Sequence, residues 1–397
     1  MTSAHHDTSF AARQIWTAAW CATFLKIVCA VLTLGTVDIT SFQEFGATIL
    51  SEGMPALYQR EPLFNHMPLV GGFSALLATI VGDQQRLFAL LFRLPGIAAD
   101  LVTVSVLLRH VPLTLPAVRW AMLLFAHSPV SFMVSGFHGN VDPILVCMLV
   151  LTTAACADGR LLASAVFYAV ACNLKAPALL LGPAIFFFWI GRGAGTRFAL
   201  AAGALTLLGW SYPLLACPQS FLRNVLGYSS YWGTWGITYW LWRSGLEQFE
   251  GIRHGNFTAA QAAVMQTLKW VIIAGTLFLS WWRRRVKGDQ LFVTVAGVWL
   301  IFMALAPGGA AQYLVWPAPF LLLVSPRSYA LVTAASTLHL GIFYTVLCGG
   351  LPWDYGIVRP DTDPNSWLLT SNLPWLAFTA VLCWHAPRLF SRADARK

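Results

Sequence analysis

HGNVDP, residues 138–143, leads directly into an apolar stretch that continues to residue 157, and this junction decides the fold class. Pro143 suits the first turn of a helix and Asp142 the capping position before it, so the segment predicts the start of a membrane helix. His138 and Asn140 add polar groups beside it, and Gly139 would let a ligand approach the backbone closely. Because polar residues at a membrane boundary are costly, we expect ligand binding here as well as a helix start.

The composition places the chain among proteins that cross the bilayer several times. Of its 397 residues, 57% are hydrophobic and 10% are charged, and the mean hydropathy is +0.65. A crossing helix needs about 20 apolar residues, and shorter or tilted crossings are tolerated. Twelve segments predict an all-α polytopic membrane fold: residues 15–36, 87–108, 119–136, 141–157, 161–174, 177–191, 198–216, 264–282, 291–306, 312–325, 328–348 and 371–387.

A thirteenth apolar stretch, residues 67–82, decides the orientation. Counting it as a crossing would put the basic run 283–287 outside, although basic loops favour the cytoplasm. We therefore expect this stretch to lie on the outer surface. Both termini then lie in the cytoplasm, together with fifteen of the 25 Lys and Arg residues. The net charge of +9 thus reflects topology and lipid head groups, and no nucleic-acid partner is expected.

Asp38 is a second carboxylate at a predicted outer helix end. It precedes the helix-compatible stretch SFQEFGATIL, residues 41–50, so it either caps that helix or takes part in catalysis. Lys175 lies beside Pro177 between two short apolar runs, and its ammonium either reaches the interface or binds a phosphate. The predicted topology puts these residues on one face with residues 138–143 and the outer segment 217–263, where they can share a cavity.

Two further charges lie deeper in the predicted spans. Lys26 lies roughly 18 Å below Asp38, and Asp100 lies roughly 21 Å below Arg86, at 1.5 Å per helical residue. Lone charges at such a depth are expensive, so we predict that Lys26 and Asp100 form a buried ion pair.

The eight cysteines lie mostly inside apolar segments and lack a C-x-x-C spacing. This usage is typical of small core residues. A disulfide between Cys217 and Cys348 is the alternative for that pair, because both fall near predicted outer helix ends.

Several short motifs follow one another in a set order over residues 38–183. They are Asp38, SFQEFGATI (41–49), EPLFNHMPL (61–69), LFRLPGIAADL (91–101), GFHGNVDPI (136–144) and NLKAPALLLGP (173–183). This order resembles the GT-C glycosyltransferases that use polyprenyl-phosphate sugars. It is most similar to the lipid-linked-oligosaccharide glucosyltransferases and to bacterial polyprenyl-phosphate-mannose enzymes. In the C-terminal half, PGGAAQYLVWPAPF (307–320) resembles the Q-Y-x-x-W-x-x-P pattern of the bacterial members, whereas the eukaryotic His-Glu-Lys motif is missing.

The resemblance implies a module of seven spans over residues 1–216, with surface-lying helices in its first outer loop, 37–86. A variable module would then cover residues 217–397, with the outer loop 217–263 and five further spans. It also implies that Asp38 is the general base, and that the donor's phosphate is both leaving group and membrane anchor. In-line attack would invert the anomeric centre.

The remaining candidate residues receive roles in binding. We expect His138 and Asp142 to orient the acceptor and Lys175 or Arg93 to lie near the phosphate. The alternative for Arg93 is a buried polar network with Asp100. The other candidates for acceptor or donor binding are Glu44, Asn140, Gln312, Tyr313 and Trp316. The expected partners are a polyprenyl-phosphate sugar, a glycolipid or glycan acceptor and membrane lipids. Mannose, the bacterial inner membrane and a monomer are expected by analogy.

Three alternatives accompany this interpretation. DTDP, residues 361–364, resembles a metal-binding Asp-x-Asp, but turn chemistry explains it as well, and no cofactor is expected. SSYWGTWGITYWLW, residues 229–242, either anchors the chain at the interface or stacks on a sugar. A transporter or flippase would also need buried charges and broken helices. The polar groups gather on one face and no inverted repeat is visible, so we favour an enzyme.

Overall fold

The computed structural model describes residues 2–228, 230–245, 257–359, 363 and 365–391, with side chains from residue 8 onward. Its described part contains eight helices long and apolar enough to cross a membrane. They are Thr8–Leu32 within α1 (Thr2–Leu32), α5 (Gln85–His110), the compound segment Pro116–His138, α11 (Gly195–Ala216), α14 (Ala259–Trp282), α15 (Gly288–Leu305), α17 (Pro326–Cys348) and α18 (Asn365–Leu389). The prediction of an all-α multi-pass membrane protein is confirmed at this level.

Shorter apolar helices occupy the other predicted segments. They are α4 (Pro68–Val81), α8 (Asp142–Ala157), α9 (Leu161–Cys172), η2 with α10 (Ala176–Leu181 and Gly182–Ile190), and η3 with α16 (Ala311–Val315 and Ala318–Val324). All twelve predicted segments therefore fall on helices. Four of them fall on these shorter helices, so twelve crossings stay a prediction.

The compound segment Pro116–His138 is built from three pieces. α6 (Pro116–Ala126) is followed by α7 (Pro129–Ser131), which Ser128 caps by accepting a hydrogen bond from the Ser131 N–H at 3.3 Å. The last piece is a π-helix, η1 (Phe132–His138), and such turns are frequent at functional sites. η1 ends at His138, the first residue of the polar 138–143 segment.

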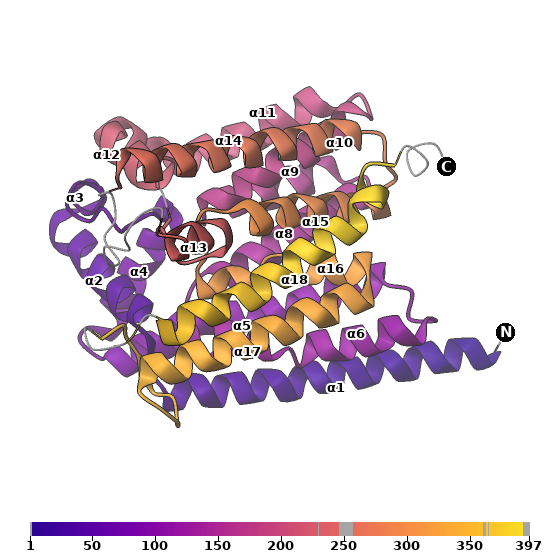
Figure 1. Cartoon of the computed structure of the whole chain (residues 1–397), viewed down its shortest axis with the longest axis horizontal. Helices are drawn as coiled ribbons and strands as arrows, with labels where there is room; N and C mark the ends of the chain where they lie inside the picture. The colour runs from indigo at the N-terminus through magenta and orange to yellow at the C-terminus, as the bar shows by residue number, and fades with distance from the viewer. Residues whose placement is uncertain (1, 229, 246–256, 360–362, 364, 392–397) are drawn as a thin grey trace.

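Figure 1 shows the long helices lying side by side between two ends of the molecule. Both chain termini lie at one end, and α2 (Val37–Glu52), α3 (Met54–Arg60) and α4 lie at the other, which we call the site end. α12 (Pro218–Val225) also lies there, and α13 (Gly236–Arg243) packs on α18. A parallel pair of two-residue strands, β1 (Gly35–Thr36) and β2 (Tyr355–Gly356), joins the chain after α1 to the loop after α17.

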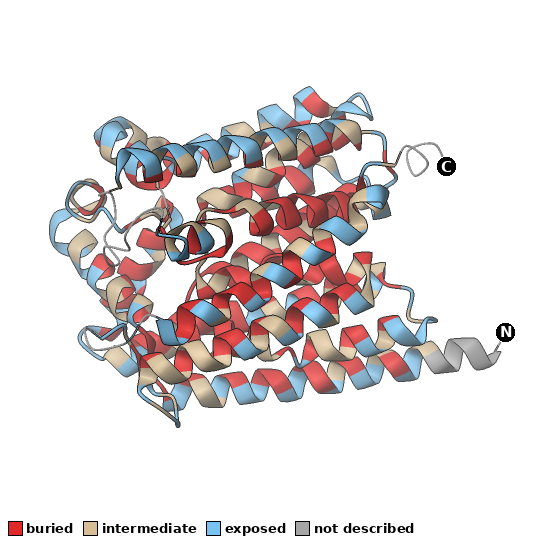
Figure 2. Ribbon diagram, viewed as in Figure 1, coloured by how far each residue is buried: buried red, intermediate tan, exposed pale blue. Residues whose placement is uncertain are grey.

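The burial pattern agrees with a lipid environment. Buried residues line the inner faces of the helices, whereas exposed residues mark their outer faces (Figure 2). Several exposed side chains are large and apolar, among them Trp120 on α6 and Leu215 on α11, which is 85% exposed. Lipid chains are as apolar as these side chains, so such exposure carries little cost in a bilayer.

Lys26 and Asp100 form the predicted ion pair, in which Lys26 is buried and Asp100 is partly buried. The Lys26 Nζ lies 2.6 Å from the Asp100 Oδ2 and donates to the Ser131 hydroxyl at 2.7 Å. The hydroxyls of Ser131 and Ser135 donate to the same carboxylate oxygen at 2.8 and 2.6 Å. The pair therefore ties α1, α5 and the compound segment together inside the bundle.

Candidate active site

Asp38 lies in the first turn of α2, and two residues of the 138–143 segment hold its carboxylate. The His138 Nε2 lies 3.0 Å from the Asp38 Oδ2, and the Asn140 Nδ2 donates to the same oxygen at 2.6 Å. The N-cap residue of α2 is Thr36, without a side-chain capping bond, so capping is not the role of Asp38. No group in the described part of the chain donates to the other oxygen, Oδ1. The predicted proximity of Asp38 to this segment is confirmed.

Two glycines let the segments approach each other. Gly35 and Gly139 have φ angles of 88° and 80°, which favour glycine. A Cβ atom on Gly35 would lie 2.6 Å from the Phe137 carbonyl oxygen, and one on Gly139 would overlap the Ile39 side chain. The side chain of Ile39, rather than a ligand, thus makes the close approach to Gly139, and our expectation for that glycine was wrong.

The neighbours of Asp38 keep its carboxylate charged. Burial on its own raises the pKa of Asp38, but His138, Asn140 and Lys175 outweigh burial and lower the pKa to about 2. His138 acts through both charge and its hydrogen bond, Asn140 through its hydrogen bond, and Lys175 through charge alone. At neutral pH, Asp38 is therefore a carboxylate that can accept a proton.

Tyr344 on α17 holds the other side of His138. Its hydroxyl lies 2.8 Å from the His138 Nδ1, while Nε2 faces Asp38. The three side chains form a continuous hydrogen-bonded chain from α2 through η1 to α17. Nothing in the stretch around Tyr344 distinguishes it from an ordinary helix aromatic residue, so the sequence offered no signal for it.

Lys175 and Asp142 form a second, fully buried ion pair. The Lys175 Nζ lies 3.1 and 2.9 Å from the two carboxylate oxygens of Asp142, and the Trp316 Nε1 donates to one of them at 2.6 Å. Asp142 makes no capping bond in α8 and does not line the cavity to which Lys175 contributes. Its role in the structure is to neutralise and hold Lys175, rather than to orient an acceptor.

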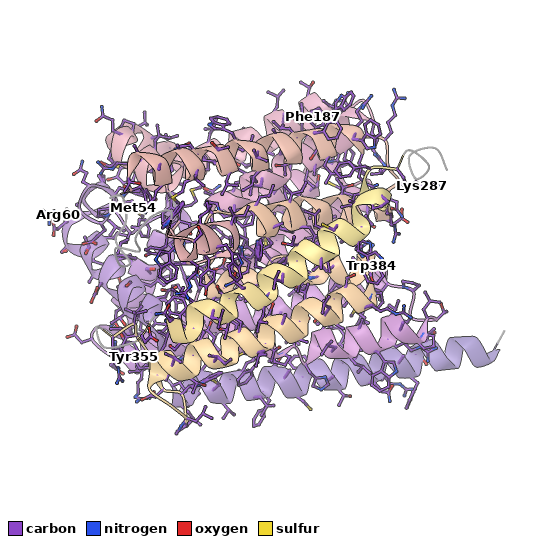
Figure 3. The ribbon with its side chains drawn as sticks, in the orientation of Figure 1. Met54, Arg60, Phe187, Lys287, Tyr355 and Trp384 are labelled. Atoms are coloured by element: carbon purple, nitrogen blue, oxygen red, sulfur yellow. The ribbon has the colours of Figure 1, made fainter. Side chains whose placement is uncertain are left out.

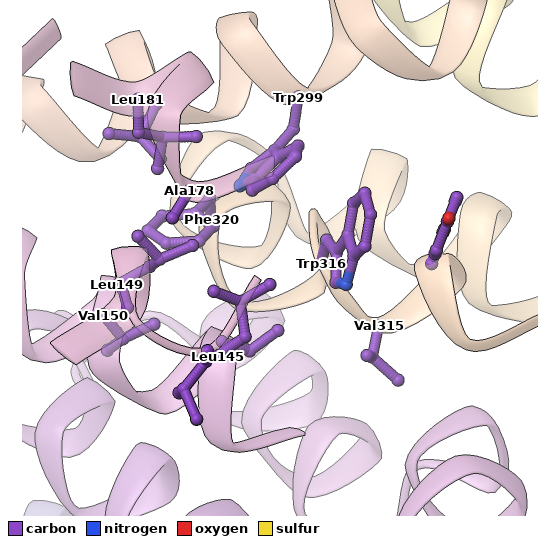
Figure 4. Close-up of a cluster of buried hydrophobic side chains, with 14 of the residues drawn as sticks. Leu145, Leu149, Val150, Ala178, Leu181, Trp299, Val315, Trp316 and Phe320 are labelled. Atoms are coloured by element: carbon purple, nitrogen blue, oxygen red, sulfur yellow. The ribbon is translucent and has the colours of Figure 1, made fainter. Parts of the chain in front are cut away.

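Trp316 anchors this ion pair to the apolar core. Its ring lies 5.1 Å from that of Trp299 on α15 and 4.0 Å from that of Tyr313. Figure 4 shows the surrounding cluster, whose labelled members also include Leu145, Leu149, Val150, Ala178, Leu181, Val315 and Phe320. The Lys175 ammonium lies 5.2 Å from the Tyr313 ring centroid, close enough for a cation–π contact.

Asp38 and Lys175 line the same cavity, which has a volume of about 400 Å³. One part of its surface, the polar wall, consists of Asp38, Asn65, His66, His138, Asn140, Lys175, Gln312 and Tyr313. Another part, which we call the aromatic wall, consists of Thr234, Trp235, His339, Phe343, Trp367 and Ser371. Polar groups beside aromatic rings in a concave site are typical of small-molecule recognition.

The other candidate residues divide between the cavity and its surroundings. Gln312 and Tyr313 line it, and Trp316 lies behind the polar wall against Asp142. Glu44 is exposed on α2 and does not line the cavity.

Arg93 is buried away from the cavity. Its guanidinium donates to the carbonyl oxygens of Ala30, Thr33, Ala89, Gly136 and Phe137 and to the Thr33 hydroxyl. These bonds favour a structural role, as a clamp between the end of α1 and η1, over contact with a phosphate. No ion pair with Asp100 is among them.

The aromatic segment 229–242 divides between the two interpretations. Trp235 lines the cavity and donates its Nε1 to the Met303 carbonyl at 2.9 Å, whereas Trp240 is 48% exposed. Residue 229 lies outside the described residues. One part of the segment therefore builds the aromatic wall, and another faces outward.

The described residues support neither a metal site at residues 361–364 nor a disulfide between Cys217 and Cys348. Within the described residues, no three His, Cys, Asp or Glu side chains are placed to hold a metal ion. Asp363 accepts hydrogen bonds from the backbone and side chain of Asn365, both at 3.0 Å, as turn chemistry predicts, and Asp361 lies outside the described residues. Cys217 and Cys348 are free thiols.

His66 is a cavity residue that the sequence alone does not single out. It belongs to the EPLFNHMPL stretch, and its backbone pairs antiparallel with that of Lys175. The sequence does not predict the pairing of His66 with Lys175, because the two positions lie 109 residues apart.

Comparison with protein-family models and with curated proteins finds no match for this chain. The class that fold and site define is therefore an all-α multi-pass membrane protein with a carboxylate, an imidazole and an ammonium around one cavity at the end opposite its termini.

Proposed function

We propose that the protein is an integral membrane glycosyltransferase that moves a hexose, mannose by analogy, from a polyprenyl phosphate to a glycolipid or glycan acceptor. The observation that carries this proposal is the arrangement of Asp38. One carboxylate oxygen is fixed by His138 and Asn140, the other has no partner among the described residues, and Lys175 lines the same cavity. A fixed base and a cation in one cavity are what sugar transfer from a phosphate requires.

The chemistry is a single displacement. The acceptor hydroxyl oxygen forms a bond to the anomeric carbon while the bond from that carbon to the phosphate oxygen breaks. The acceptor proton passes to the Asp38 Oδ1, and the bonding electron pair leaves with the phosphate near Lys175. One carboxylate suffices because a phosphate leaves without protonation, in contrast to the alkoxide in glycoside hydrolysis. Attack opposite the leaving group inverts the anomeric configuration.

A low pKa is compatible with this role for Asp38. The attacking hydroxyl becomes strongly acidic only as its bond to the anomeric carbon forms, so a weakly basic carboxylate can accept the proton at that stage. The fixed position of the carboxylate supplies the geometry that general-base catalysis needs.

Orientation in the membrane is part of the proposal. With twelve crossings and both termini in the cytoplasm, the cavity would open toward the outer face of a bacterial inner membrane. Gathering of the polar side chains at one end supports an enzyme over an alternating-access transporter, whose binding site lies near the midplane.

The test is transfer by the purified full-length protein. It would be incubated with a panel of polyprenyl-phosphate sugars, and release of polyprenyl phosphate would be measured. Asp38→Asn keeps the size of the side chain but removes the base, so we expect the rate to fall by about 100-fold or more. Asp83→Asn, which removes the charge of an exposed acid elsewhere in the first outer loop, serves as the control. Turnover by Asp38→Asn close to that of the control would rule out Asp38 as the base.

A further inference from the structure

His66 carries a buried nitrogen that has no hydrogen-bond partner among the described residues. The atom is Nδ1, on a side chain that lines the cavity and belongs to a residue only 7% exposed. Buried polar atoms in native proteins are nearly always paired, and an unpaired one calls for an explanation. A ligand group in the cavity would supply the missing partner.

The backbone directs His66 to the same place as Lys175. The two residues form an antiparallel bridge, and residues directly opposite each other in such a pair project their side chains from the same side. Both line the cavity accordingly. The Phe42 and Phe64 rings lie 5.0 and 6.0 Å from the imidazole, and the Tyr58 hydroxyl donates to the His66 carbonyl at 2.9 Å. The ring is therefore held in position before a ligand arrives.

Lys175 alone does not supply enough positive charge or hydrogen-bond donors to bind a phosphate. Asp142 contacts the Lys175 ammonium with both oxygens, so the pair as a whole carries no net charge. A phosphate placed there would depend on additional N–H or O–H groups.

The His66 ring can supply such a donor without adding charge. Burial, followed by the charge of Lys175, lowers the pKa of His66 to about 3, against a smaller opposite effect of Asp38. The ring is therefore neutral at working pH and carries one N–H.

We propose that His66 and Lys175 together bind the phosphate of the lipid-linked donor, with the His66 Nδ1–H donating to a phosphate oxygen. This inference rests on the proposed function, because it takes a polyprenyl phosphate as the ligand. It identifies His66 as a binding residue and leaves the transfer chemistry to Asp38.

The experiment measures binding separately from turnover. Native mass spectrometry of the full-length protein in detergent would compare farnesyl phosphate with farnesol, which share a chain and differ in the phosphate. His66→Phe keeps the ring contacts but loses the nitrogen, so it should weaken farnesyl phosphate binding about tenfold and leave farnesol binding unchanged. His66→Asn should recover most of the affinity because its amide reaches the position of Nδ1, whereas His66→Gln should not.

His127→Phe is the matched control, because His127 is an exposed histidine whose Nδ1 lies 3.0 Å from the Leu123 carbonyl of its own helix. It should bind both probes like the unaltered protein. Equal farnesyl phosphate affinity of His66→Phe and the unaltered protein would overturn the inference and leave the proposed function standing, as would an equal loss for both probes. Failure of the unaltered protein to prefer farnesyl phosphate over farnesol would instead count against the proposed function and the inference together.

Discussion

Asp38 uses its two oxygens differently, and this asymmetry determines what the residue can do. Its Oδ2 is bound to His138 and Asn140, which fix the plane of the carboxylate, while Tyr344 fixes the imidazole from behind. A carboxylate held through one oxygen keeps its second oxygen in a fixed position. Precise positioning of this kind accounts for large parts of enzymatic rate enhancements.

The pH dependence of transfer is a prediction at this scale. The pKa of Asp38 is lowered to about 2 from an ordinary value of about 3.9, so the carboxylate stays charged above pH 2. Its stabilising contacts are fully present above the ordinary pKa and are lost only as the pH falls toward 2. We therefore expect the plot of kcat/KM against pH to have no acid limb centred near pH 4. Initial rates measured from pH 3.5 to 7 check this, and a limb near pH 4 would contradict the lowered pKa.

At the scale of residues, candidate site residues could be predicted where their type is rare in the chain. Charged residues make up 10% of the chain, so Asp38, Lys175 and the 138–143 segment stood out among apolar neighbours. Their partners did not stand out. The pairing of Asp142 with Lys175 and Trp316 joins positions up to 174 residues apart, and only packing determines it.

At the scale of elements, the length of the apolar segments predicted the helices, and proline residues predicted where helices are interrupted. The break before η2 lies at Lys175, where Pro177 predicted it. The π-helix η1 was not predictable, because its extra residue per turn leaves no mark on a short apolar run. Since η1 brings His138 to Asp38, the sequence could indicate that the two residues are close but not how they meet.

The buried pair between α1 and α5 carries a prediction about stability. Replacing Asp100 with Asn leaves Lys26, which is 4% exposed, as an uncompensated charge among apolar side chains. Removing one partner of a buried pair costs about 3 kcal/mol or more, so the free energy of unfolding should fall by this amount. Denaturation of the purified protein in mixed detergent micelles measures it.

The control for this experiment is the exposed ion pair between Arg60 and Glu52 at the site end. Glu52→Gln should change the free energy of unfolding by less than about 1 kcal/mol, because solvent screens such a pair. Equal effects of the two substitutions would show that the Lys26–Asp100 pair does not hold α1 to α5.

The whole molecule has two distinct ends, and this gives a prediction about topology. Figure 3 shows Arg60 and Tyr355 at the site end and Lys287 at the end of the termini. Cysteines at positions 60 and 287 should therefore react on opposite sides of the membrane, in a protein whose exposed Cys21 and Cys383 are replaced by Ser. In intact bacterial cells with a permeabilised outer membrane, an impermeant maleimide should label Arg60→Cys and spare Lys287→Cys. The reverse pattern would place the cavity on the cytoplasmic side.

The strand pair β1–β2 makes the first part of the site dependent on the last part of the chain. Gly35 and Thr36 lie just before Asp38, and they pair with Tyr355 and Gly356, about 320 residues later. A ribosome adding roughly 5–20 residues per second needs about 15 to 60 s to make that stretch. In a nascent chain, Asp38 is therefore made long before β2, the strand that pairs with β1 beside it. Activity should appear only when translation is nearly complete.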